Sequence, residues 1–210
     1  AGAIDLENIN DNLTATTVTA GGANDITLLT TTSGDITIDA IDATGNLVRI
    51  TSAGSIAENG DAGTDITAAT AALRAATGIG TDADSLDTAS SGTLTIAATT
   101  ESGDIAITNS GALIVGTVDT LSGATVVDTA DNNSGADNIT LIASSPLTVS
   151  DAVVNNDGGN ITLTATNNGG DDDDLTISAN VTATGGSGTI DLNAGTDLFI
   201  DNDATVSVVG

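Results

Sequence analysis

The chain has 210 residues and a strongly unbalanced charge: 29 Asp and Glu stand against two basic residues, Arg49 and Arg74, for a net charge of −27. This charge argues against nucleic acid and acidic membrane surfaces as partners, and the lack of Cys excludes a disulfide framework or a thiolate metal site. An apolar fraction of 39%, mostly Ala, Ile, Leu and Val, indicates a folded chain. Abundant Thr, with Gly, Asn and Asp for turns, predicts an all-β fold.

One short phrase recurs along the chain: a Gly, Asp or Asn corner, then an apolar residue, a variable residue and a second apolar residue. Because the alternation has period 2, Ile and Leu are predicted to face inward and Thr outward, in strands of about four or five residues. In chain order the phrase stands at residues 25–28, 34–38, 92–96, 103–107, 137–141, 159–163 and 188–192.

The spacing of these strands predicts stacked coils. Ile139 and Ile161 are 22 residues apart, with short strands expected between them at residues 147–149 and 152–154. Residues 189–192, 197–200 and 204–208 form a similar set of three. We therefore predict an all-β, right-handed parallel β-helix (solenoid) of roughly nine coils with three short strands each, spanning residues 1–210 as a single segment. Immunoglobulin-like sandwiches are the rival, but they usually need longer strands and a large core aromatic.

Two segments depart from the repeat. Residues 67–78 are rich in Ala and end in Gly, which fits either a short flanking helix or a coil of small residues with Leu73 inward, and we favour the coil. Residues 167–174 add an acidic loop excursion to one coil, because extra residues in a repeat normally loop out on one face.

The repeat resembles a known family. The runs SGDITIDA (residues 33–40), GNLVRITSAGSIAENG (45–60) and GGNITLTATNNGG (158–170) are similar to the shafts of filamentous-haemagglutinin-like exoproteins. The same holds for residues 66–80 and 102–123. These are large surface proteins of Gram-negative bacteria, exported by two-partner secretion or as autotransporters. The resemblance implies an extracellular rod at the bacterial cell surface, which serves adhesion to host or neighbouring cells, biofilm or filament assembly.

Candidate binding residues are acidic. Hard cations prefer oxygen ligands, and Asp171, Asp172, Asp173 and Asp174 lie in a Gly-flanked loop, with Asp201 and Asp203 at another oxygen-rich corner. These six are possible calcium ligands, although no strict calcium motif is present and a solvated acidic loop is the alternative. We expect no required cofactor.

Other functions find less support in the residues. Paired carboxylates of a polysaccharide-active β-helix enzyme are conceivable, yet the chain offers one Phe, two Arg and no His, Lys, Cys or Tyr, so we expect no enzyme. Rows of Thr at residues 14–19 are too irregular for an ice-binding array. Asn-x-Ser/Thr sequences begin at Asn12, Asn132, Asn138, Asn160 and Asn180, where we expect Asn to turn corners rather than to bear glycans.

Both ends of the chain lack a polar cap, and joining residues 208–210 to residues 1–6 would continue the repeat without a break. Uncapped β-helices tend to stack end to end. We expect either continuation into a longer chain or head-to-tail self-association. No apolar run is long enough for a membrane span.

Overall fold

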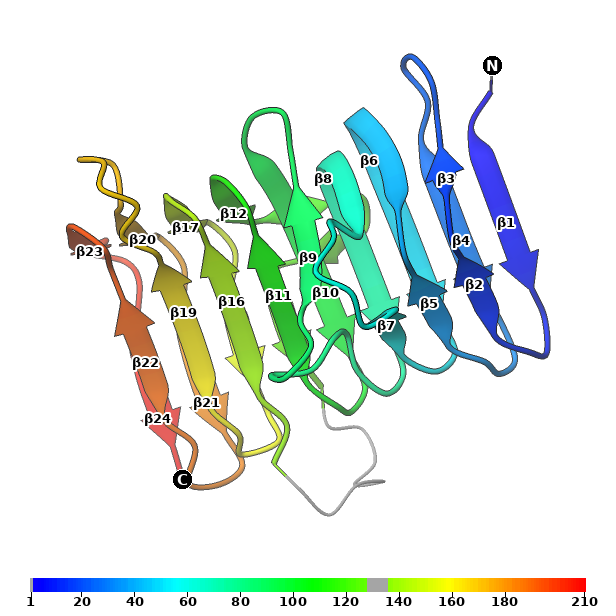
Figure 1. The fold of residues 1–210 in the computed structure, drawn as a ribbon. Helices are drawn as coiled ribbons and strands as arrows, with labels where there is room; N and C mark the ends of the chain where they lie inside the picture. Colours follow the sequence, from blue (N-terminus) through cyan, green and yellow to red (C-terminus); the bar gives the residue numbers. More distant parts are fainter. Residues whose placement is uncertain (1, 128–135) are drawn as a thin grey trace.

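The computed structural model describes residues 2–127 and 136–210, and every regular element in these two ranges is a β-strand. The strands pair almost entirely in parallel and form a solenoid of about nine turns. Figure 1 shows the coils stacked in chain order, from β1 (blue) at one end to β22–β24 (red) at the other. The prediction of an all-β solenoid with short parallel strands is confirmed.

In the first half of the solenoid each coil has three faces. Face 1 contains β1 (Ile4–Asn8), β4 (Ile26–Thr30), the second halves of β6 (Ile41–Ser52) and β8 (Ile66–Ala75), and β10 (Leu94–Thr100). Face 2 contains β2 (Leu13–Ala15), β5 (Ile36–Ile38) and β7 (Ile56–Glu58). Face 3 contains β3 (Val18–Thr19), the first halves of β6 and β8, and β9 (Leu86–Ala89).

The second half also has three stacks of strands. The first contains β11 (Ile105–Asn109), β16 (Ile139–Ala143), β19 (Ile161–Ala165) and β22 (Ile190–Asn193). The second contains β12 (Leu113–Val115), β17 (Leu147–Val149), β20 (Leu175–Ile177) and β23 (Leu198–Ile200). The third contains β15 (Ala124–Val126), β18 (Val153–Asn155), β21 (Val181–Thr184) and β24 (Val206–Val209).

The two halves meet in residues 79–109, which we call the junction. Ile79 links β7 of face 2 to Ile105 at the start of β11, while β9 of face 3 pairs with the end of the same strand. Faces 2 and 3 therefore merge into β11. Face 1 divides instead: Leu94–Ile96 of β10 pairs with β12, and Ala98–Thr100 pairs with β15. The cross-section of the rod changes at this point.

The core consists of inward-facing columns that run through the coils. Ile139, Ile161 and Ile190 lie in register, as do Leu141, Leu163 and Leu192, while the residues between them, Thr140, Thr162 and Asp191, face outward. Most inward side chains before the last coil are fully buried. Period-2 alternation thus places the apolar residues as predicted.

Residues 67–78 settle the choice between helix and coil. Strand β8 covers Ile66–Ala75 and pairs with β6 along most of its length, with one register shift. Leu73 is fully buried between Ile50 below and Ala98 above. The coil interpretation is confirmed and the helix is wrong, because cross-coil pairing and burial outweigh the intrinsic helix propensity of Ala.

Candidate functional site

Acidic and amide side chains at the corners connect neighbouring coils. Asp35 Oδ1 accepts the backbone N–H of Ser55 at 2.7 Å, and Asp104 Oδ1 accepts that of Asn138 at 2.7 Å. Each acceptor lies one coil away from its donor, so the bond ties coils together. A carboxylate is a strong acceptor for such N–H groups. Part of the large negative charge therefore has a structural role.

The Asn residues of the Asn-x-Ser/Thr sequences act in the same way. Asn138 Oδ1 accepts the N–H of Asn160 at 3.0 Å, and Asn160 Oδ1 in turn accepts that of Thr189 at 2.9 Å. Asn12 and Asn180 make the equivalent bonds to Asp35 and Thr205, each at 2.9 Å. These contacts agree with the expected corner role. Asn132 lies outside the described residues.

The six calcium candidates do not converge on one point. In residues 167–174, Asp173 is buried and its Oδ2 accepts the N–H of Asn168, whereas Asp174 Oδ1 accepts the N–H of Asp197 in the next coil. Asp171 and Asp172 are exposed. Asp201 and Asp203 lie in an exposed turn before β24 (Val206–Val209). Across residues 2–127 and 136–210, no three His, Cys, Asp or Glu side chains are placed to hold a metal ion. The two alternatives for these residues, calcium binding and a solvated acidic loop, both stay predictions.

A small hairpin lies on the outer surface beside the point where face 1 divides. Strands β13 (Thr117–Val118) and β14 (Leu121–Ser122) pair antiparallel. Val118 is 5% exposed and forms a second, separate apolar cluster with Ala72 and Ala97, against which Leu47 and Leu121 pack. The hairpin thus covers the outward-facing Ala72 of β8 and Ala97 of β10, next to Leu47 of β6.

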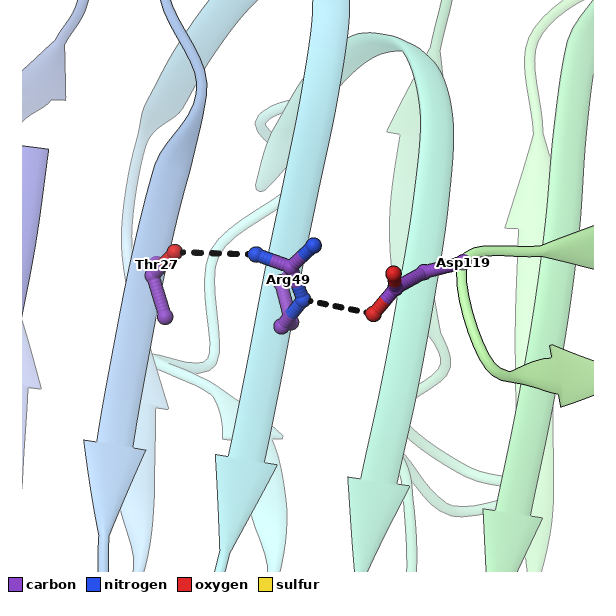
Figure 2. Close-up of polar contacts among 3 residues, drawn as sticks. All are labelled: Thr27, Arg49 and Asp119. Carbon is purple, nitrogen blue, oxygen red and sulfur yellow. Dashed lines mark hydrogen bonds and ion pairs between the residues drawn. The ribbon is translucent and has the colours of Figure 1, made fainter. Parts of the chain in front are cut away.

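Polar contacts hold this hairpin on both sides. Arg49 Nε donates to Asp119 Oδ2 at 2.9 Å, and Arg49 Nη1 donates to Thr27 Oγ1 at 3.3 Å (Figure 2). On the other side, Thr117 Oγ1 donates to Asp151 Oδ2 at 2.6 Å. The hydrogen bond from Arg49 is the main cause that lowers the pKa of Asp119. The contacts brace several coils from outside, and sequence reasoning did not find them because the paired residues are far apart in the chain.

A second unexpected feature is a carboxyl group inside the rod. Glu58 is the last residue of β7, and its side chain is 7% exposed. It is in register with Ile38, which is in register with Ala15, so an apolar column ends in a charged residue. Neither carboxylate oxygen of Glu58 accepts a hydrogen bond from the described residues.

Asp65 is buried nearby, immediately before β8. It has no exposed surface; its Oδ2 accepts the N–H of Asp87 at 2.7 Å, and its Oδ1 has no hydrogen-bond partner among the described residues. Burial raises the pKa of Glu58 to about 7, and the carboxyl of Asp84 and the negative charges of Asp65, Asp84 and Asp61 add to this. Burial also raises the pKa of Asp65 to about 7, against the lowering effect of its bond from Asp87. We call Glu58 and Asp65 the acidic pair.

The sequence alone could have indicated that Glu58 is unusual. In Ile56-Ala57-Glu58 the glutamate occupies the second inward position of the repeated phrase, where most other strands have Ile, Leu, Val or Ala and a few have an uncharged Thr or Asn. A charged residue at an inward position is a departure that marks either strain or function.

A shallow hollow of about 230 Å³ lies beside the junction, and its lining includes Thr64, Asp87, Thr108 and Ser110. Its lining contains one carboxylate, Asp87, and no aromatic or basic side chain. Glycoside hydrolysis by paired carboxylates requires two, so the hollow adds no support to the enzyme alternative.

Within the described ranges, no helix has the length and apolar character needed to cross a membrane. The chain matches no protein family, no curated protein and no solved structure.

Proposed function

We propose that this chain is the structural rod of a bacterial surface adhesin or filament, working outside the cell and presenting or extending an adhesive surface. One observation supports the proposal above the others: parallel pairing continues from β1 to β24 through every coil, over an unbroken apolar core. At about 4.8 Å per coil the rod is on the order of 45 Å long. The resemblance of its repeats to filamentous-haemagglutinin-like shafts supplies the extracellular setting.

The last coil presents an open edge. Strands β22, β23 and β24 each pair only with the preceding coil among the described strands. Leu198 is in register with the fully buried Leu175 and Leu147, yet it is 44% exposed because no further coil covers it. Unpaired backbone groups with apolar side chains form a template for another strand. We propose that this edge continues the stack, by further coils of the same chain or by the first coil of a second copy.

Self-association through this edge is tested with two lysine variants. Leu198→Lys places a charge where the next coil would dock, whereas Phe199→Lys adds the same charge at the neighbouring residue, which is in register with the outward-facing Thr176. We expect the wild type and the Phe199→Lys variant to form end-to-end fibres in electron micrographs and the Leu198→Lys variant to remain monomeric. A monodisperse wild-type monomer, or fibres of all three proteins, would refute stacking through this edge.

The rod and its adhesive role are tested separately. Small-angle X-ray scattering of the Leu198→Lys monomer should give an elongated particle, and a compact sphere would contradict the rod. Beads coated with the folded chain should be retained on bacterial or host cells more than beads coated with heat-unfolded chain. Equal retention would contradict adhesion while leaving the rod intact.

A further inference from the structure

Among the described residues, no positively charged side chain balances the acidic pair. The charged groups that act on Glu58 and Asp65 are all carboxyls: Asp61, Asp84 and Asp87, besides the pair itself. Arg49 is bound to Asp119 on the outer surface, and Arg74 is exposed on β8. Burying an ionised carboxylate without a partner is costly, so such a group requires either a bound cation or a proton.

The arrangement favours the proton. No three acidic side chains in the described ranges are placed to hold a metal ion. The carboxyl of Asp84 instead raises the pKa of Glu58 as a side-chain hydrogen-bond partner, although Glu58 accepts no bond from an N–H or O–H donor among the described residues. Two ionised carboxylates cannot form this bond, because neither has a hydrogen to donate. With one proton between them the contact becomes an O–H···O hydrogen bond, as in other carboxyl pairs that share a proton.

The acidic pair also has a particular place in the fold. Glu58 ends the last strand of face 2 and Asp65 immediately precedes a strand of face 3, so the chain crosses between the two faces through residues 59–65. One coil later the chain crosses again, through a tight turn in which Thr81 and Asp84 exchange backbone hydrogen bonds of 2.9 and 3.0 Å. The first crossing lies next to the junction, where faces 2 and 3 merge, and the second lies within it.

We propose that the acidic pair is a proton-dependent switch in the middle of the rod: with Glu58 and Asp65 neutral the two crossings pack closed, and with both ionised this coil loosens. The pKa of each group in the folded chain lies above its ordinary value. The folded chain therefore holds protons that the unfolded chain has released between about pH 4 and pH 7, and stability falls as the pH rises through this window. Above about pH 7 the loss is complete.

The protonation state is tested first on the wild-type chain. Exposed Asp and Glu have an ordinary pKa near 4 and are ionised at pH 6. The infrared carbonyl band of protonated carboxyl groups should therefore persist at pH 6 and disappear by pH 8.5, and it should shrink in the Glu58→Gln and Asp65→Asn variants. A wild-type spectrum without this band at pH 6 would overturn the proposal, and this result does not depend on whether the variants fold.

The structural effect is tested by amide hydrogen exchange at residues 59–65 and 79–87, comparing proteins at one pH so that intrinsic exchange rates cancel. At pH 8.5 we expect the Glu58→Gln, Asp65→Asn double variant to exchange at least tenfold more slowly there than the wild type, and at pH 5.5 the two should agree within twofold. Glu101→Gln, which removes one exposed charge outside the acidic pair, serves as the control. Its exchange rates should equal those of the wild type at both pH 5.5 and pH 8.5. Equal wild-type and double-variant exchange at pH 8.5, or the same slowing in the control, would overturn the switch.

Discussion

Leu73 offers a direct test of how the core is built. The side chain is fully buried in a column between Ile50 and Ala98, whose positions are held by the backbone ladders of β6 and β10. Leu73→Ala removes three carbon atoms, worth about 2.4 kcal/mol of transfer free energy at roughly 0.8 kcal/mol each. The ladders limit collapse around the vacated space, so a cavity cost of about 1 kcal/mol adds to it. We expect the free energy of unfolding of the Leu73→Ala variant to be about 3 to 4 kcal/mol lower than that of the wild type.

The measurement is urea denaturation followed by far-ultraviolet circular dichroism, because the chain has no Trp or Tyr for fluorescence. Arg74→Ala, at the adjacent and exposed position, is the matched control and should change the free energy of unfolding by less than about 0.5 kcal/mol. A cost below about 1 kcal/mol for Leu73→Ala, or similar costs for both variants, would refute the inward assignment of Leu73.

Three further predictions concern charge. Because Glu58 and Asp65 bind protons more tightly when folded, the free energy of unfolding should fall between pH 4 and pH 7 by at most about 3 kcal/mol for Glu58 and about 4 kcal/mol for Asp65, and urea midpoints that rise with pH would contradict this. Asp119→Asn breaks a solvent-exposed ion pair, so it should lower the free energy of unfolding only slightly, with a smaller loss in 1 M salt; a salt-independent loss would argue against a Coulombic contact. Since Asp173 and Asp174 already accept backbone hydrogen bonds, calcium should shift the melting temperature no more than magnesium at equal ionic strength, and a calcium-specific rise would instead establish binding.

Strand positions could be predicted from the sequence because each coil repeats one local rule. An inward Ile or Leu at every second residue marks a strand, and a Gly, Asn or Asp marks the corner. Thus residues 147–149 were predicted and found as β17, and the strand expected at residues 152–154 is found as β18, Val153–Asn155. The segment at residues 67–78, which could have been a helix or a strand, also follows this rule, because its strand β8 pairs with β6.

The features that could not be predicted depend on contacts between distant coils. Arg49 and Asp119 are 70 residues apart, and neither lies in a motif that indicates the other. The merging of faces 2 and 3 into β11 depends on which coil lies above Ile79, which no local pattern specifies. The calcium candidates show the opposite case, in which a local sequence pattern suggests a site that the fold does not assemble. Four adjacent Asp residues suggest one site, but neighbouring side chains point in different directions and two of them are used for backbone bonds.

The two departures from the repeat occur at the same level of the rod, and this suggests a common cause. Where face 1 divides, the β13–β14 hairpin covers β6, β8 and β10 from outside. Where faces 2 and 3 merge, the acidic pair lies inside. A regular solenoid needs neither device, since identical coils stack on one another without adjustment. A change of cross-section interrupts that regularity. The β13–β14 hairpin and the acidic pair therefore lie where neighbouring coils differ in shape and stack less well on one another. The middle of the rod, rather than its uniform coils, is therefore where pH should most readily alter its stiffness.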